Sequence, residues 1–141
     1  MLFFTVESRW IVQNNISWFP GHMAKARRLL ADQLQRIDAV IELCDARLPL
    51  SSRNPDLDPL VGNKPRVLLL NKSDLANPTQ TKAWQAYFQN QGLDCMAIEM
   101  GRKKQSILSA IVKLTEERVA RSLKKGIHRS ARAMVLGVPN V

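Results

Sequence analysis

The sequence contains few of the residues that would indicate a secreted, metal-binding or membrane protein. Its 141 residues include two cysteines, Cys44 and Cys95, which lie far apart and show no metal-ligand spacing. We therefore expect no disulfide framework and no metal site, and we expect both thiols to be small and buried. No apolar run is long enough to span a membrane, and the opening Met1-Leu2-Phe3-Phe4 lacks the basic lead of a signal peptide. These absences predict a cytoplasmic protein.

Acidic residues are scarce towards the end of the chain. Residues 102–141 contain ten Lys/Arg and two Asp/Glu, whereas residues 1–101 contain eleven and ten, so nearly all of the net charge of +9 lies in residues 102–141. Concentrated positive charge indicates a polyanionic partner, and nucleic acid is the usual one. A solvated basic face is the alternative. The candidate nucleic-acid contacts are Lys25, Arg28, Lys103, Lys104, Lys124, Lys125 and Arg129.

Short apolar runs alternate with amphipathic segments along the chain, and hydrophobic residues make up 45% of it. This pattern predicts one α/β domain with a parallel sheet. The expected strands cover residues 39–44, 66–70, 95–98 and 133–136. Helices are expected from about residue 23 to 37, from Asn77-Pro78 to Gly92, and over 106–123, with a short turn near 57–61.

The apolar faces of two expected helices follow from spacings of three and four residues. In the first helix this face comprises Met23, Ala26, Leu30, Leu34 and Ile37, and we expect Trp18 and Phe19 to pack beneath the helix start. In the last it comprises Leu108, Ile111, Val112, Thr115, Val119 and Leu123. Residues 1–17 show no clean period and predict a leader that is either a loosely docked strand or disordered.

The stretch Arg66–Leu70 runs directly into Asn71-Lys72-Ser73-Asp74. A buried parallel strand places the residues that follow it at the ligand-binding edge of an α/β sheet. The Asp74 carboxylate can accept hydrogen bonds from the ring N–H and exocyclic amine of guanine, which adenine cannot supply in that arrangement. The Lys72 stem can lie along the base plane, and Asn71 can tie the loop together. Ordinary loop residues are the alternative interpretation of the same tetrapeptide.

The last expected strand runs into Gly137-Val138-Pro139-Asn140-Val141. These residues supply five of the eight positions of the phosphate loop Gly-x-x-x-x-Gly-Lys-[Ser/Thr]. This partial match is weak by itself. It becomes specific because the order is reversed: Ras-like GTPases place the phosphate loop before the Asn-Lys-x-Asp motif, and this chain places it after.

The sequence resembles the circularly permuted GTPases of the ribosome biogenesis GTPase A family over about residues 16–141. Five blocks in the same order carry the resemblance: Trp18–Ala26, Asp45–Arg47, Ser51–Pro55, Asn71–Asp74 and Gly137–Val141. The resemblance implies a Ras-like, circularly permuted and truncated P-loop GTPase domain over residues 18–141, with about four parallel strands. It also implies the guanine-nucleotide-binding part of a GTPase that assists assembly of the large ribosomal subunit, with GTP or GDP as ligand and rRNA as a partner.

The resemblance assigns residues to roles. Asn71, Lys72 and Asp74 match the family's guanine-specificity motif, and Gly137, Val138, Pro139 and Asn140 match the start of its phosphate loop. His22 falls on a histidine that takes the place of the water-orienting glutamine of Ras-like enzymes, and a purely structural role at a helix start is the alternative. Residues 99–104 depart from the family's small serine-containing loop, which puts a second guanine contact in doubt.

Several parts of a complete GTPase are missing from these 141 residues. They contain no phosphate-loop lysine or Ser/Thr, no switch threonine and no Asp-x-x-Gly after the phosphate-loop start. We therefore expect them to hydrolyse no GTP alone and to bind it weakly, and we expect Mg²⁺ only in a complete protein. A non-catalytic RNA- or ribosome-binding fragment is one alternative, and a generic α/β domain is another. The strand at 134–136 is expected at an open sheet edge, which predicts self-association or disorder beyond about Arg129.

Overall fold

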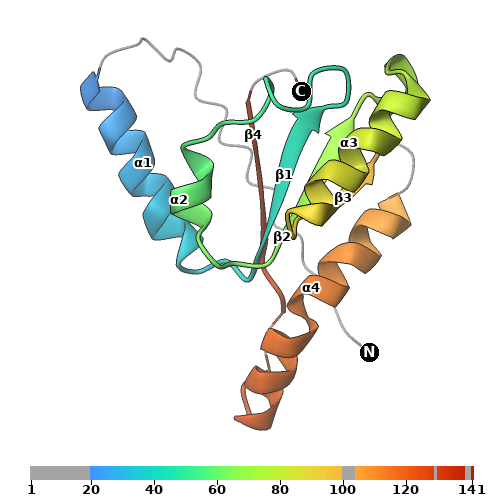
Figure 1. Cartoon of the computed structure of the whole chain (residues 1–141). Helices are drawn as coiled ribbons and strands as arrows, with labels where there is room; N and C mark the ends of the chain where they lie inside the picture. Colours follow the sequence, from blue (N-terminus) through green and yellow to red (C-terminus); the bar gives the residue numbers. More distant parts are fainter. Residues whose placement is uncertain (1–19, 100–103, 129, 139–140) are drawn as a thin grey trace.

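Four short strands form one parallel sheet at the centre of the molecule (Figure 1). The computed structural model describes residues 20–99, 104–128, 130–138 and 141. Its strands are β1 (Ala39–Asp45), β2 (Arg66–Asn71), β3 (Asp94–Ala97) and β4 (Ala133–Gly137), in the order β3-β2-β1-β4 across the sheet. The expected fold class, a four-strand parallel sheet with flanking helices, is confirmed.

Helices cover both faces of the sheet. They are α1 (Pro20–Leu34), α2 (Leu57–Val61), α3 (Pro78–Asn90) and α4 (Lys104–Lys124), and a single 3₁₀ turn, η1, spans Ser73–Leu75. The first three pack on one face and α4 packs on the other. The Asn77 side chain caps α3 as predicted, because its Oδ1 accepts hydrogen bonds from the backbone N of Thr79 at 3.0 Å and of Gln80 at 3.2 Å.

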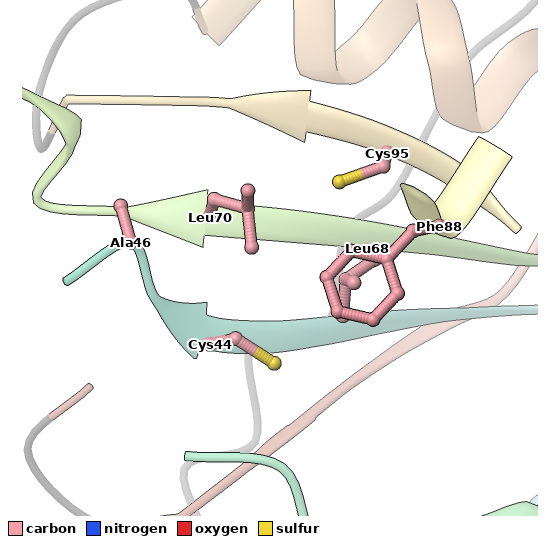
Figure 2. Close-up of a cluster of buried hydrophobic side chains, with 6 residues drawn as sticks. All are labelled: Cys44, Ala46, Leu68, Leu70, Phe88 and Cys95. Carbon is pink, nitrogen blue, oxygen red and sulfur yellow. The ribbon is translucent and has the colours of Figure 1, made fainter. Parts of the chain in front are cut away.

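Apart from the buried Glu42 of β1, the interiors of the two central strands are apolar on both sides because both sides are covered. On the α3 side, Leu68 and Leu70 of β2 pack with Phe88 of α3, and Figure 2 shows the thiols of Cys44 and Cys95 in the same cluster. On the α4 side, the opposite residues of these strands pack against the helix. Burial raises the pKa of both thiols to about 12, so both cysteines are the small buried side chains that the sequence predicts.

The buried face of α4 differs from the predicted one. Ile111, Thr115 and Val119 are buried as expected, but Leu108 and Leu123 are 43% and 45% exposed. Ile107 and Leu114, on the neighbouring helical rows, pack against the sheet instead. The prediction was wrong at both ends of the helix because a three-or-four spacing fits two adjacent stripes, and the sheet covers one of them.

β4 lies at the edge of the sheet and pairs with β1, as expected. Met134 and Leu136 pack on the side of α1 and α2, whereas Val135, on the α4 side, is 50% exposed. Disorder beyond about Arg129 does not hold for residues 130–138, which form this strand and its approach. Residues 1–17, Trp18 and Phe19 lie outside the described residues, so the predicted leader and its boundary stay predictions. Within the described residues, no helix is both long and apolar enough to cross a bilayer.

Truncating Phe88 tests the core on the α3 side. Phe88 is fully buried, so Phe88→Ala is expected to lower the free energy of unfolding by about 3–5 kcal/mol in urea denaturation. Tyr87→Ala, at the neighbouring 43% exposed position, is the matched control and should cost less than about 1.5 kcal/mol, since it weakens aromatic packing but opens no cavity. Equal losses of stability for the two variants would contradict this account of the core.

Candidate guanine-nucleotide site

The ends of β1, β2 and β4 meet at the carboxyl edge of the sheet. The parallel register pairs Asp45 with Asn71 and Leu43 with Gly137. The three loops that follow these strands therefore leave the sheet side by side, where α/β proteins bind their ligands. The register thus brings the Asn71–Asp74 motif and the Gly137–Val141 segment to one place, although they lie far apart in the chain.

Asn71 connects these two segments directly. Its side chain is 1% exposed, and its Nδ2 donates a hydrogen bond to the backbone oxygen of Val141 at 3.3 Å. Its own backbone oxygen accepts a hydrogen bond from the backbone N of Ala46 at 2.8 Å. Among the described residues, the Asn71 Oδ1 atom is buried without a hydrogen-bond partner. An unpaired buried acceptor costs roughly 1–3 kcal/mol, so this atom fits a ligand that brings a donor.

The rest of the motif is bent into a tight turn and tied by hydrogen bonds to Ile98, the residue that follows β3. Lys72 adopts a left-handed backbone conformation with φ 59° and ψ 34°, which costs a non-glycine residue on the order of 1–3 kcal/mol. Ser73 then donates two hydrogen bonds to the backbone oxygen of Ile98, from its N at 3.1 Å and from its Oγ at 2.9 Å. Asp74 follows with an exposed side chain. The motif is therefore held at both ends while its carboxylate faces solvent.

Asp45 provides a negative charge beside this turn. Its Oδ2 atom lies 3.4 Å from Lys72 Nζ and 2.7 Å from Arg47 Nη2, and its Oδ1 accepts hydrogen bonds from Arg47 N and Nε, both at 2.9 Å. Hydrogen bonds from Arg47, aided by Lys72 and opposed by burial, hold the pKa of the Asp45 carboxyl well below its usual range. The site therefore carries an ionised, almost buried carboxylate between two cations.

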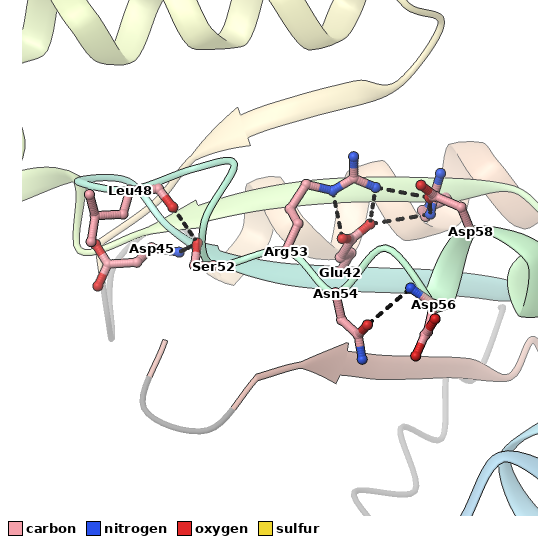
Figure 3. A network of polar contacts seen from close by, with 9 residues as sticks. Glu42, Asp45, Leu48, Ser52, Arg53, Asn54, Asp56 and Asp58 are labelled. Carbon is pink, nitrogen blue, oxygen red and sulfur yellow. Dashed lines mark hydrogen bonds and ion pairs between the residues drawn. The ribbon is translucent and has the colours of Figure 1, made fainter. Parts of the chain in front are cut away.

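The loop that follows β1 is anchored at two points, both drawn in Figure 3. Ser52 Oγ accepts a hydrogen bond from Asp45 N at 2.8 Å and donates one to the Leu48 oxygen at 2.8 Å. Arg53 forms a two-pronged ion pair with Glu42 of β1, at 2.8 and 3.1 Å. The Glu42 carboxylate is almost completely buried and also lies 3.3 Å from a second arginine, that of β2. These contacts hold the backbone from which Asp45 projects.

Gly137 lies in close contact with β1 and with Val141. A Cβ atom at this position would lie 2.9 Å from the Leu43 oxygen and 3.2 Å from Val141 Cγ2. Such close approach to backbone favours glycine. Val138 is partly buried, and the two residues that follow it, Pro139 and Asn140, lie outside the described residues. The segment begins as a phosphate loop does, with a strand that ends in a glycine which larger residues cannot easily replace.

Comparison with known proteins agrees with this geometry. Ribosome biogenesis GTPase A from Bacillus pumilus is 46% identical over 129 residues, covering 89% of this chain, and that from Priestia megaterium is 48% identical over 130 residues. The chain belongs to the ribosome biogenesis GTPase A family. The crystal structure of GNP-bound YlqF from T. maritima superposes with a TM-score of 0.62 at 29% identity, over 82% of this chain and 43% of that one. No family model matches the sequence.

The chain spans about half the length of the family members it matches, 46% of the B. pumilus protein and 45% of the P. megaterium protein. The sheet is that of a circularly permuted GTPase, in which β2 leads to Asn71–Asp74 and β4, later in the chain, leads to Gly137–Val141. The resemblance deduced from five sequence blocks and the expected fold class are thereby confirmed.

Among the predicted residues whose side chains the structure describes, Lys25, Arg28, Lys124 and Lys125 are not gathered into this site. His22 lies in the first turn of α1, and its side chain is not among the described ones. The side chains of Lys25 and Arg28 on α1 are exposed, as are those of Lys124 and Lys125 at the end of α4, on the opposite face of the sheet (Figure 1). Lys103 and Arg129 lie outside the described residues, as does the side chain of Lys104.

Three contributors to the site were missed by sequence reasoning. Ser73 occupies the variable position of its motif, yet it ties the turn to Ile98, directly after β3. Asp45 and Ser52 were noted as parts of matching blocks without a role. The sequence signal for Asp45 is its place directly after an apolar strand, the same signal that pointed to Asn71.

Replacing Gly137 tests the close approach at the phosphate-loop start. Gly137→Ala is expected to lower the free energy of unfolding by about 1–3 kcal/mol, because the new methyl group meets backbone atoms of β1. Gly21→Ala in α1 is the matched control: its Cβ meets nothing within 4 Å, so it should be neutral or stabilise by up to about 1 kcal/mol. Urea denaturation measures both. A neutral Gly137→Ala would show that the segment can move away from β1.

Proposed function

We propose that this chain provides the base-recognising half of a GTP site, within a GTPase that assists assembly of the large ribosomal subunit. The observation that carries the proposal is the position of Asn71. It joins the base-reading motif to the phosphate-loop segment through Val141, and it keeps a buried acceptor atom without a partner among the described residues. A ligand that fits this edge has a base at the turn and phosphates at the Gly137–Val141 loop.

The chemistry of the turn favours guanine. Asp74 presents an exposed carboxylate that can accept hydrogen bonds from two adjacent N–H donors, and guanine carries such a pair on its ring nitrogen and exocyclic amine. Adenine offers an acceptor in place of one of them. Hydrogen bonds to a charged group are worth roughly 1.5–3 kcal/mol each, so this one side chain accounts for a marked preference. Ser73 limits the freedom of the turn before the base binds.

The names of similar proteins support this proposed function. They include ribosome biogenesis GTPases, and one solved neighbour is described as GNP-bound. We extend the proposal to GTP hydrolysis by a complete protein, with His22 as the candidate for orienting water. The described residues include no cluster of three or more His, Cys, Asp or Glu that fits a metal ion, so the proposal assigns Mg²⁺ no ligand among them.

Changing Asp74 to Asn tests base recognition. Isothermal titration of the 141-residue chain should show that GDP binds more tightly than ADP, and that Asp74→Asn reduces GDP affinity on the order of tenfold or more. The variant should gain affinity for xanthosine diphosphate, because the asparagine amide can donate to the second xanthine carbonyl. Asp94→Asn, an exposed carboxylate at the far end of β3, is the control and should leave GDP binding unchanged. Equal binding of GDP and ADP by the unmodified chain would contradict the proposal.

A second function, contact with rRNA, is favoured by the charge distribution. Residues 102–141 carry a net charge of +8. The end of α4, at Lys124, lies beyond the end of the sheet (Figure 1), and Lys124 and the following Lys125 are exposed. Arg121 is 71% exposed, although it lies 3.4 Å from Glu117. We propose that the C-terminal end of α4 contacts RNA phosphates. The predicted basic residues form two separate surfaces, one on α1 and one at the C-terminal end of α4. We favour the surface on α4 as the RNA contact.

Salt dependence measures this contact. Binding of a labelled single-stranded RNA should weaken with salt, and replacing Lys124 and Lys125 by Gln should reduce the log–log slope by roughly 1.4, about 0.7 for each phosphate that is no longer neutralised. Arg36→Gln with Lys82→Gln removes the same charge from exposed positions elsewhere and serves as the control. An equal change of slope for both pairs would indicate nonspecific attraction and no defined surface.

We also propose that the 141-residue chain associates with itself through β4. The strand is at the sheet edge, and Val135 leaves apolar surface in solvent, a combination that favours pairing with another strand. Sedimentation at tens of micromolar should show dimers or larger species, and Val135→Lys should shift them to monomer. Ile127→Lys, at a 52% exposed position outside the strand, should not. A monomeric unmodified chain would exclude this association.

A further inference from the structure

The Asp45 carboxylate makes none of the nucleotide contacts proposed above, yet several neighbouring groups form hydrogen bonds and ion pairs with it. Asp45 is 7% exposed and pairs in the sheet register with Asn71, so it lies directly beside the base-reading motif. It accepts three hydrogen bonds from Arg47, and its Oδ2 lies 3.4 Å from Lys72 Nζ. Figure 3 shows the hydrogen bond between the Asp45 backbone and Ser52, which fixes the main chain behind the carboxylate.

Lys72 is the residue in the motif whose conformation most needs support. Its φ of 59° is the sole positive value among the described non-glycine residues. Such a conformation persists when neighbouring contacts impose it. Asn71 before it is tied to Val141, and Ser73 after it is tied to Ile98. The contact with Asp45 restrains the Lys72 side chain itself.

We propose that Asp45 is a positioning residue for the guanine nucleotide, acting through Lys72. The carboxylate holds the Lys72 ammonium at the end of β1, which keeps the lysine stem along the sheet edge and the turn in its left-handed conformation before a base arrives. Arg47 orients the carboxylate with its two-pronged contact. This inference rests on the proposed function, because the value of a preset turn is a smaller ordering cost on binding.

A purely structural role makes a different prediction. The hydrogen bond from Arg47 N to Asp45 Oδ1 closes a local turn after β1, and Asp45 would then matter for stability alone. Asp45→Asn separates the two roles, because asparagine keeps the Oδ1 acceptor and removes the charge that attracts Lys72.

A double-mutant cycle in the 141-residue chain tests the route through Lys72. Asp45→Asn should weaken GDP binding about tenfold in isothermal titration, measured at a temperature where the variant is still folded. In the Lys72→Met background the same change should cost less than twofold, since the contact is already gone. A reduction of GDP affinity by the same factor in both backgrounds would overturn the proposal, as would an unaltered affinity in Asp45→Asn. Asp58→Asn removes another ion-paired carboxylate, which contacts Arg53 and Arg66, and should leave GDP affinity unchanged.

Hydrogen exchange tests the same contact without any nucleotide. The Ser73 and Leu75 amides donate to the oxygens of Ile98 and Lys72, and both should exchange at least fivefold faster in Asp45→Asn and in Lys72→Met, while the amides of α3 stay unchanged. Lys72→Met changes a partly exposed side chain, so it keeps the test valid if Asp45→Asn fails to fold. Unchanged exchange in Lys72→Met would overturn the proposal. If the unmodified chain does not bind GDP, the proposed function is refuted. The hydrogen-exchange rates then decide by themselves whether Asp45 restrains the turn.

Discussion

The parallel register of three strands is the constraint on which the site depends. Because β1 pairs with β2 at Asp45 and Asn71, and with β4 at Leu43 and Gly137, every loop of the site leaves the sheet within one strand spacing of the next. A slip by one residue would turn each of these side chains to the opposite face. Such a slip would also turn the buried Glu42 carboxylate away from Arg53, so this ion pair and the packing of the core together set the geometry of the polar edge.

Two buried carboxylates on β1 must be compensated by neighbouring positive charges. Glu42 and Asp45 are 1% and 7% exposed, and burying a charge without a partner is strongly unfavourable. Each is therefore surrounded by cations: Arg53 and Arg66 at Glu42, and Arg47 and Lys72 at Asp45. The first group anchors the loop after β1, and the second lies at the site. Removing one member of such a group is expected to destabilise more than replacing the whole group by apolar residues.

Much of the fold could be predicted because its signals are local. The apolar runs at Val67–Leu70 and Val40–Cys44 allow few alternatives to buried strands, and Asn77-Pro78 marks a helix start by its own chemistry. The buried stripe of α4 could not be predicted, since Leu108 and Ile107 fit equally good spacings and the choice depends on where the sheet lies. The roles of Ser73 and Asp45 were hidden for a similar reason: their partners, Ile98 and Lys72, are distant in sequence and meet them across strands.

The single amide of Asn71 has a thermodynamic consequence. Its Nδ2 is committed to the Val141 oxygen, while its Oδ1 is buried and has no hydrogen-bond partner among the described residues. Whatever orders the segment around Val141 also orients the amide, and whatever engages the amide at the base also restrains that segment. Binding energies linked in this way are reciprocal. In the proposed site, the base and the phosphates of one nucleotide would therefore raise each other's affinity by the same factor. The Asn71 side chain provides this link between two segments whose order in the chain is reversed by the permutation.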